Sequence, residues 1–385
     1  MNWFLTEEQN MIIETAREVA QKKILPVREK YDHEGIFPWD VVEAMADADL
    51  CGLYIPEEYG GFGGGVFELC LAVEELSKAC GGISLAMAAT ALGTFPILLF
   101  ANEEQKKKYL PPIASGKKLA AFGLTEANAG SDAIGMMKTT AKLDGDHYIL
   151  NGTKQWITNG ENAEIYTILA ITNPNRGARG VSAFIVEKGT PGFSFGKHED
   201  KMGIRASSTT ELVFQDCRVP KENLLGKEGL GAIITINTLN YSRPGVGSQA
   251  LGIAAGALGD ALVYSRQRIQ SGVPISSFQA IQHMLADMAT EIEAARALLY
   301  ATARTIDGGE KRFAKEAAMA KLYCSDVAMK VTVDALQVMG GYGYMREYPM
   351  EKRMRDAKIT QIYEGTNQIQ RNEIALQLIK DAASL

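Results

Sequence analysis

A single carboxylate near the end of the chain has the neighbours that a catalytic base needs. Glu364 lies in "RDAKITQIYEGTNQIQ" (355–370), between the aromatic Tyr363 and Gly365. Burial beside an aromatic ring raises the proton affinity of a carboxylate, and a glycine-marked break frees backbone N–H groups. The stretch therefore fits a general base presented at a chain break, or a helix end that carries a surface glutamate.

Two stretches in the middle of the chain carry residues that can hold a flat polar ligand. "AFGLTEANAGSD" (121–132) offers small hydroxyls and backbone N–H groups to a phosphate or a polar ring, although an ordinary surface turn has the same composition. In "KQWITN" (154–159), Trp156 can stack on a ring while Thr158 donates a hydrogen bond. Taken alone, this second stretch fits core packing better.

A pair of arginines provides a third candidate site. Arg266 and Arg268 in "YSRQRIQSG" (264–272) either complement a helix dipole or reach a pyrophosphate. The glycine-rich "GFGGGV" (61–66) and "GGYGY" (340–344) lie in helical surroundings and do not match a Rossmann fingerprint. No CxxC and no histidine pair at metal-binding spacing occurs, so we expect no metal site.

Composition restricts the class of protein. A chain of 385 residues predicts two or three domains, and a net charge of -6 argues against nucleic acid or an anionic membrane as the main partner. The start, "MNWFLTEEQN", is not a secretory signal, and we find no uninterrupted apolar run of about 18 residues. We expect a cytoplasmic protein with five reduced cysteines and no membrane insertion.

The elements that position these residues change character twice along the chain. Residues 1–119 read as helical, with a capping box at Thr6 and Gln9. Residues 120–227 contain alternating runs, including a hairpin over 139–160. Residues 228–385 return to helical spacing. A bundle seam is formed there by Ile281, Leu285, Met288, Ile292, Ala295 and Leu299. The prediction is an α+β fold, mainly α: an N-terminal helical domain, a middle antiparallel β-barrel and a C-terminal four-helix bundle.

The order of these parts and five motifs resemble the acyl-CoA dehydrogenase family over essentially the whole chain. The motifs are "GLTEANAGSD", "WIT", "RQRIQSG" with Gln279 further on, "LQVMGGYGY" (336–344) and "YEGTNQIQR" (363–371). The last is similar to the catalytic stretch of the short-chain (butyryl-CoA dehydrogenase-like) and medium-chain branch. The resemblance implies non-covalently bound FAD, an acyl-CoA substrate, an electron-transferring flavoprotein as partner, and a homotetramer (a dimer of dimers) that acts in fatty acid β-oxidation.

The resemblance also implies roles for single residues. Glu364 is the catalytic base, because Ser242, where some members carry the base, cannot serve as one. The implied FAD contacts are Phe122, Leu124, Thr125, Gly130, Ser131, Trp156, Ile157, Thr158, Arg268, Gln279, Gln337, Val338, Gly340, Gly341, Thr366, Asn367 and Gln368. Of these, Arg268, Gln279 and 337–341 are implied to reach the FAD of a neighbouring subunit. The implied substrate contacts are Ser131, Asn240, Arg243, Tyr363 and Gly365.

Two positions depart from the family pattern. Asn240 stands where members often have an aspartate, and Ser271 stands where an aromatic is usual. Neither position belongs to the expected redox centre, so we interpret both as affecting affinity for CoA or FAD, or subfamily, rather than reaction type.

The implied reaction is α,β-dehydrogenation of an acyl-CoA to the trans-2-enoyl-CoA. Glu364 takes the α-proton, the β-hydride passes to flavin N5, and the electrons leave to the electron-transferring flavoprotein. A short-chain, branched or alicyclic acyl group is expected. The alternatives are an enoyl-CoA reductase that runs the reverse reaction with a bifurcating electron-transferring flavoprotein, and a non-catalytic helical scaffold that retains the fold.

Overall fold

The N-terminal part of the chain is helical, as the sequence predicts. The computed structural model describes residues 3–383. Its first helices are α1 (Glu7–Val19), which continues into a π-helical turn (Ala20–Ile24), α2 (Arg28–Glu34), α3 (Trp39–Asp47), α4 (Val66–Ala79), α5 (Gly81–Phe100) and α6 (Glu103–Ala114). The capping box at Thr6 and Gln9 is confirmed: Gln9 N donates to Thr6 Oγ1 at 3.2 Å, and Thr6 N donates to Gln9 Oε1 at 3.1 Å.

The middle part is a mixed β-sheet. Its strands are β1 (Ala120–Gly123), β2 (Thr140–Asp144), β3 (His147–Thr158), β4 (Ile165–Ile171), β5 (Val181–Glu187), β6 (Phe193–His198), β7 (Thr209–Pro220) and β8 (Leu224–Leu225). The strand order is β6-β7-β3-β2-β4-β5-β8, with β1 beside β4. The predicted hairpin is confirmed as β2 and β3. Closure into a barrel is not confirmed, and the pairs β1–β4 and β2–β4 are parallel, because β1 and β2 enter the sheet from long connections and not from hairpins with β4.

Long helices form the C-terminal part. They are α7 (Gly231–Gln267), α8 (Gln279–Asp307), α9 (Ala314–Met339), α10 (Gly341–Tyr344), α11 (Met350–Thr360) and α12 (Asn367–Ala382), and a short hairpin of β9 (Ile269–Gln270) and β10 (Val273–Pro274) joins α7 to α8. Along the predicted seam, Met288, Ile292, Ala295 and Leu299 of α8 are buried. The α+β, mainly helical fold is thus confirmed.

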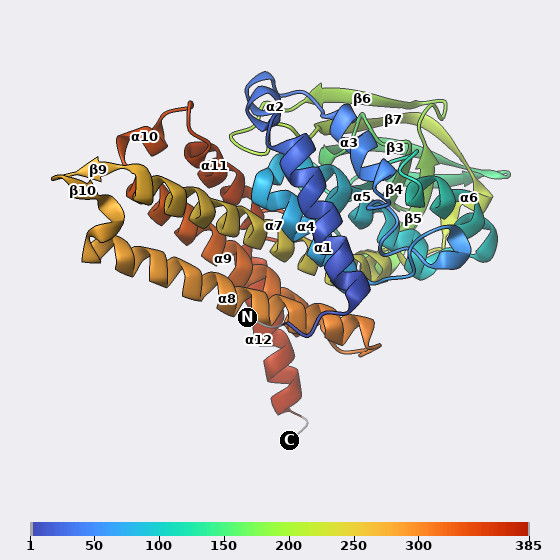
Figure 1. Cartoon of the computed structure of the whole chain (residues 1–385). Coiled ribbons are helices and arrows are strands. Elements are labelled where there is room, and N and C mark those ends of the chain that lie inside the picture. Colours follow the sequence, from blue (N-terminus) through green and yellow to red (C-terminus); the bar gives the residue numbers. More distant parts are fainter. Residues whose placement is uncertain (1–2, 384–385) are drawn as a thin grey trace.

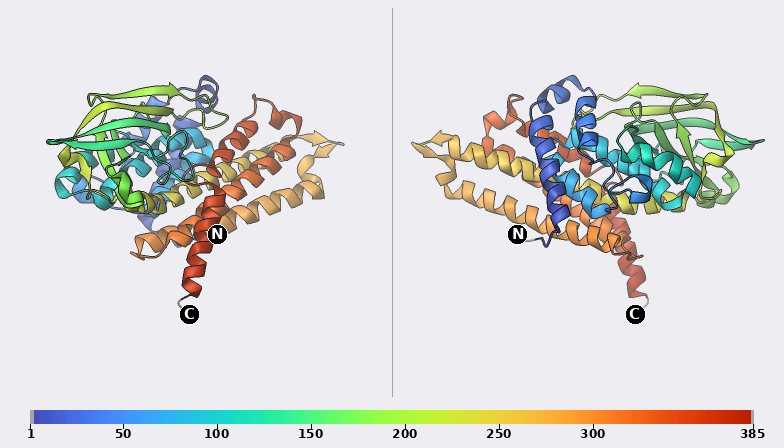
Figure 2. Two further views of the ribbon diagram at one scale, coloured as in Figure 1. Left: turned by 180° about the vertical axis from the view of Figure 1, so that it is seen from behind. Right: turned by 45° about the vertical axis from the view of Figure 1, so that its right-hand side comes forward.

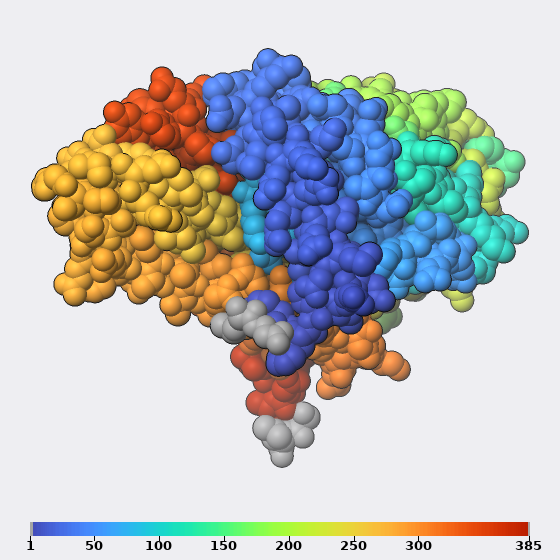
Figure 3. Space-filling model, viewed as in Figure 1, coloured from blue at the N-terminus to red at the C-terminus, as the bar shows by residue number. Residues whose placement is uncertain are grey.

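The three parts are arranged so that the bundle helices extend away from the sheet. In Figure 1 and Figure 2, the β9–β10 hairpin and the sheet lie at opposite ends, with α1 to α5 between them. α12 projects from the body, and the space-filling view shows it as a separate stalk (Figure 3). Glu364 lies in the segment that connects α11 to α12.

The expectation of no apolar stretch long enough to cross a membrane needs correction. Among residues 3–383, α5 and α7 have the length and mean hydropathy of a spanning helix. Of the most apolar window, 72% is buried inside the protein in α5 and 61% in α7. Both helices are apolar nearly all round because they form the core that the sheet and the bundle share.

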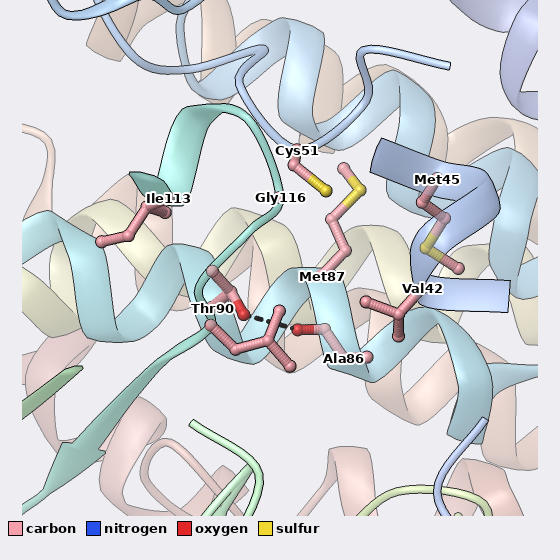
Figure 4. Close-up of a pocket in the computed structure, with 9 residues that line it drawn as sticks. Val42, Met45, Cys51, Ala86, Met87, Thr90, Ile113 and Gly116 are labelled. Carbon is pink, nitrogen blue, oxygen red and sulfur yellow. Dashed lines mark hydrogen bonds between the residues drawn. The ribbon is translucent and has the colours of Figure 1, made fainter. Parts of the chain in front are cut away.

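The packing around α5 is close. Figure 4 shows the hollow between α5, α3 and the connection from α6 to β1, which measures only ≈ 10 Å³ and is lined by side chains such as Met45, Cys51 and Met87. Burial raises the pKa of the Cys51 thiol to about 12, which makes it a poor nucleophile. This hollow is therefore part of the core. Its close packing also makes α5 a rigid wall for the cavity that other residues of the same helix line.

Candidate active site

One cavity brings together residues from all three parts of the chain. It measures ≈ 330 Å³ and lies where α5, β3, α7, the β1–β2 connection and the 363–369 segment meet. Twelve of the residues predicted to bind FAD or substrate, or to act as base, line it: Phe122, Leu124, Thr125, Gly130, Ser131, Trp156, Ile157, Thr158, Arg243, Tyr363, Glu364 and Gly365. The sequence motifs that contain them are far apart in the chain, and only the fold makes them one site.

Glu364 is held in a turn that points its carboxylate into this cavity. Its φ is 52° and that of Gly365 is 92°, so the backbone is left-handed at two successive residues. A Cβ at Gly365 would lie 2.7 Å from Gln370 Nε2, which explains the glycine at this position. Ser242 Oγ of α7 donates a hydrogen bond to Glu364 Oε2.

The surroundings of Glu364 favour its protonated form. Burial raises the pKa of the carboxyl group above its usual value, and this is the largest effect. The hydroxyl of Ser242 and the positive charges of Lys321 and Arg243 oppose it without cancelling it. A carboxylate with a raised pKa beside an apolar cavity suits a general base.

Arg243 brings a positive charge to the same cavity. It is 6% exposed, and Nη1 donates to Asn240 Oδ1 at 2.8 Å. Its Nε is buried and has no hydrogen-bond partner within residues 3–383. Burial lowers the pKa of the guanidinium. A buried donor without a partner is costly, so a polar ligand in the cavity would satisfy it. Asn240 itself does not line the cavity and acts here through Arg243.

A β-bulge turns Trp156 into the cavity. The β3–β7 pairing shifts register between Lys154 and Ile157, and Trp156 has a φ of 58°. Its side chain is 53% exposed although the strand around it is buried. The core-packing interpretation of Trp156 is therefore wrong for this residue, because the bulge reverses the direction in which its ring points.

A buried ion pair beneath Trp156 anchors the β1–β2 connection. Lys154 Nζ is inaccessible to solvent and donates to Leu124 O at 3.0 Å and Glu126 Oε1 at 2.9 Å. Glu126 in turn accepts the backbone N–H of Lys138 at 2.7 Å and of Thr139 at 2.9 Å. Burial lowers the pKa of Lys154 to about 8, against the attraction of Glu126. The loop thus has a fixed shape before any ligand binds.

Models of one family match each of the three parts. The N-terminal, middle and C-terminal domains of acyl-CoA dehydrogenase match residues 6–117, 121–217 and 229–379. The chain belongs to the acyl-CoA dehydrogenase family.

Individual relatives within the family are similar over nearly their full length. A short-chain specific acyl-CoA dehydrogenase of Megasphaera elsdenii is 50% identical over 96% of this chain and 97% of the relative. An acryloyl-CoA reductase (NADH) of Anaerotignum propionicum is 49% identical over 99% of this chain and 96% of the relative. Among solved structures, a chain from work on the electron transferring flavoprotein of Acidaminococcus fermentans and flavin-based electron bifurcation is 54% identical, with a TM-score of 0.96 and coverage of 98% and 99%.

The FAD that the family implies can be tested against the free groups of the cavity. Thr125, Ser131 and Thr158 line it, and their hydroxyls make no hydrogen bond within the described part of the chain. Trp156 offers an exposed aromatic face beside them. Unused hydroxyls around an exposed indole fit a flat ring that carries polar atoms at its edge, such as the flavin.

A second set of predicted residues lies at the far end of the bundle. Arg268, Gln279, Gln337, Gly340 and Gly341 do not line the cavity. They belong to the β9–β10 hairpin region, the start of α8, and the junction of α9 and α10, which lie side by side in Figure 1 and Figure 2. The guanidinium of Arg268 lies 5.1 Å from the centre of the Tyr342 ring. Val338 is buried in the core of the bundle.

The residues that follow Glu364 line a separate hollow. Thr366, Asn367 and Gln368 border a space of ≈ 400 Å³ together with Asp326 and Arg371. Thr366 caps α12, since its Oγ1 accepts from Ile369 N at 3.3 Å. The side chain of Asn367 is engaged inside the protein: Nδ2 donates to Asp326 Oδ1 at 2.8 Å, and Oδ1 accepts from Lys321 Nζ at 2.9 Å.

Sequence reasoning missed three residues that support the site. Lys154 and Glu126 belong to motifs for which only ligand contacts are predicted, and Lys321 belongs to a stretch for which only helical spacing is predicted. A signal for Lys321 exists, because "AAMAKLYCS" (317–325) places one charge among small apolar residues on a helix. Ser242 is predicted only to be unable to serve as a base, and no local pattern indicates its hydrogen bond to Glu364.

Proposed function

We propose that this protein catalyses FAD-dependent α,β-dehydrogenation of an acyl-CoA thioester to the trans-2-enoyl-CoA. One observation carries the proposal: the Glu364 carboxylate, the exposed ring of Trp156 and the buried guanidinium of Arg243 line a single cavity. Full-length similarity to a short-chain specific acyl-CoA dehydrogenase supports it. The non-catalytic scaffold is disfavoured because this chain retains each of these groups.

In the proposed mechanism, Glu364 removes the α-proton of the thioester. The Cα–H bond breaks, the proton goes to a carboxylate oxygen of Glu364, and the Cα–Cβ double bond forms as the β-hydride leaves. Burial raises the pKa of Glu364 and so strengthens the carboxylate as a base, while Ser242 fixes the direction of Oε2. Bound FAD supplies the acceptor for the β-hydride.

Donors must also stabilise the charge that develops on the thioester oxygen. The backbone N–H of Glu364 donates to nothing within residues 3–383, because the left-handed turn ends the helical hydrogen-bonding pattern at Tyr363. We propose that it donates to the thioester oxygen, and that Arg243 attracts the CoA side of the substrate. Ser131 and Gly365 complete the proposed substrate contacts, and Asn240 orients Arg243.

We propose that FAD lies with its ring between Trp156 and the Glu364 turn. Phe122, Leu124 and Ile157 form the apolar wall there, while Thr125, Gly130, Ser131 and Thr158 offer polar contacts. Thr366, Asn367 and Gln368 remain proposed contacts at the adjoining hollow. Arg268, Gln279, Gln337, Val338, Gly340 and Gly341 are proposed to serve a neighbouring subunit's FAD, because they lie away from the cavity of their own subunit.

A small acyl group suits the apolar end of the cavity. Leu85 and Ala89 of α5 line the cavity together with Tyr363, and they belong to one apolar cluster with Ile204 and Ile359. The Tyr363 hydroxyl donates to Gln249 Oε1, whose own Nε2 donates to Gly81 O at 2.8 Å, so the ring cannot swing aside freely. We therefore propose a short-chain, branched or alicyclic acyl-CoA. Flavin bleaching with straight, branched, dicarboxylic and alicyclic CoA esters tests this choice.

Glu364→Gln tests the assigned base. The amide keeps the shape of the side chain but cannot accept the α-proton, so the variant should bind FAD and acyl-CoA normally and fail to bleach the flavin. Glu316→Gln on α9 is the matched control and should bleach at the wild-type rate. Bleaching by Glu364→Gln at the wild-type rate would refute the proposal.

The reverse reaction is a second candidate, because the acryloyl-CoA reductase is as similar to this chain as the short-chain dehydrogenase is. The chain that was solved in the study of electron bifurcation also favours it. The purified enzyme is mixed with an electron-transferring flavoprotein and either acyl-CoA or enoyl-CoA. The ratio of acyl-CoA to enoyl-CoA at equilibrium then gives the favoured direction of the reaction.

The proposal also covers the oligomeric state, the redox partner, the cellular location and the domain boundaries. We propose a homotetramer built on the bundle, an electron-transferring flavoprotein as the redox partner, and a cytoplasmic location. The division into 1–119, 120–227 and 228–385 is proposed as the domain organisation. Five buried free cysteines support a reducing compartment, and a net charge of -6 supports the absence of a nucleic-acid partner.

A further inference from the structure

Lys321 contacts the Glu364 turn from the side that faces the bundle. It lies on α9, is buried and does not line the cavity. Its Nζ donates to Gly365 O at 2.8 Å and to Asn367 Oδ1 at 2.9 Å. Lysine side chains are seldom fully buried unless they are paired, and neither contact is a carboxylate. Their positions, one and three residues after Glu364, connect this lysine to the base.

The backbone that Lys321 contacts is in a sparsely populated conformation. Glu364 and Gly365 both have positive φ, and such a turn persists only where its surroundings fix it. Gln370 Nε2 donates to Glu364 O at 3.1 Å and to Gly365 O at 2.9 Å. Lys321 is the second donor to the Gly365 carbonyl, and it reaches that oxygen from a different helix. The turn is thus held between α9 and α12.

The charges around this turn are few. Lys321 from α9 and Arg243 from α7 face Glu364, and the Ser242 hydroxyl contacts it. Lys321 is faced by Glu364, Arg243 and Asp326, while Glu373 of α12 faces Arg243. Burial lowers the pKa of Lys321 to about 7, against the attraction of Glu364. Lys321 therefore contributes its charge most strongly below neutral pH.

We propose that Lys321 is a positioning residue for the base: its hydrogen bond to the Gly365 carbonyl fixes the turn, and its ammonium stabilises the Glu364 carboxylate. The proposal rests on the proposed function, in which Glu364 removes the α-proton. A merely structural lysine would affect folding and leave the titration of Glu364 unchanged, so that titration is the discriminating measurement.

The experiment follows the carboxyl group of Glu364 directly in the FAD-loaded enzyme. The carboxylic-acid C=O stretch that is present in the wild type and absent in Glu364→Gln is titrated by difference infrared spectroscopy. Lys321→Met should move its midpoint up by about one pH unit, because the positive charge of Lys321 lowers the pKa of the Glu364 carboxyl group and the variant removes that charge. Lys321→Gln, which keeps a donor without the charge, should move it equally, whereas Lys321→Arg should restore it.

Lys330→Met, on the same helix but exposed and paired with Glu291 and Asp334, is the matched control and should leave the midpoint unchanged. If Lys321→Met does not fold, Lys321→Gln provides the uncharged variant. An unshifted midpoint in a folded uncharged variant overturns the proposal. So does a midpoint in Lys321→Arg that equals the midpoint in Lys321→Met, or an equal shift in Lys330→Met.

Failure of this proposal can be told apart from failure of the proposed function. The infrared midpoint reports on Glu364 whether or not catalysis occurs, whereas flavin bleaching by Glu364→Gln reports on its role as base. In addition, the rising limb of the pH profile for flavin bleaching should move with the infrared midpoint in Lys321→Met.

Discussion

The hydroxyl of Ser242 donates a hydrogen bond to the carboxylate of Glu364, across 122 positions of sequence. This contact joins the middle of α7 to the turn between α11 and α12. It gives the Oε2 atom of a cavity-lining carboxylate a fixed direction. Ser242, which cannot itself be a base, is therefore a direct hydrogen-bond partner of the proposed base.

Ser242→Ala should move the pH dependence of flavin bleaching. The hydroxyl lowers the pKa of Glu364, so its loss raises the pKa further, and the rising limb should shift upwards by about one pH unit. Ser242→Thr, which keeps the hydroxyl, should retain the wild-type profile. Stopped-flow bleaching at a series of pH values measures both. An unchanged limb in Ser242→Ala would show that the hydroxyl does not act on the carboxylate.

Glu364 should also make folding less favourable as pH rises. Its pKa is raised in the folded state from 4.5, so its contribution to stability is complete below that value and is lost as pH rises through the folded pKa. Relative to the wild type, Glu364→Gln should therefore gain stability above pH 4.5, by roughly 1.4 kcal/mol per unit of pKa shift. Denaturant unfolding at several pH values checks the sign. A difference in unfolding free energy between Glu364→Gln and the wild type that does not change with pH would contradict this prediction.

Lys154→Met should weaken FAD binding without touching the cavity lining. The change leaves Glu126 as a buried carboxylate without its cation, and such a loss typically costs about 3–5 kcal/mol. The β1–β2 connection should loosen, and the purified protein should carry less FAD, measured by the ratio of flavin to protein absorbance. Lys142→Met on β2, an exposed site, is the control. Full flavin content in Lys154→Met would show that the ion pair does not shape the loop.

Asp307→Ala should destabilise the junction between the first helices and the bundle. The Asp307 carboxylate at the end of α8 accepts the N–H of Val66 at 2.8 Å and of Phe67 at 2.7 Å, which are the first residues of α4. Two N–H groups would lose their acceptor, at a cost of about 2 kcal/mol. Asp334→Ala on α9, which removes a partly exposed carboxylate paired with the exposed Lys330, should cost far less. Thermal unfolding compares the two, and equal costs would contradict the capping role.

The stalk formed by α12 should take part in the proposed tetramer. Leu376 and Ile379 on this helix are 53% and 66% exposed. Exposed apolar side chains on a helix that projects from the body (Figure 3) indicate a protein–protein contact. The double variant Leu376→Lys/Ile379→Lys should dissociate the tetramer, which sedimentation velocity can follow. Lys380→Glu on the same helix is the control, and a variant that remains tetrameric would place the interface elsewhere.

The sequence by itself determined the class of elements and the family. Capping at Thr6 and Gln9, the turn at 144–146 and the seam of α8 are local patterns, so they could be read without the fold. Twelve of the residues that line the cavity, the proposed base among them, were predicted from the resemblance of five motifs, each of which is ambiguous alone.

Only the tertiary structure decided how those residues are oriented and supported. The bulge that turns Trp156 into the cavity depends on how β3 pairs with β7, which is a long-range register. Ser242 and Lys321 reach Glu364 and its turn because α7 and α9 pack against the segment between α11 and α12. Such contacts depend on helix packing across more than forty residues of sequence, and periodicity within one helix carries no information about them.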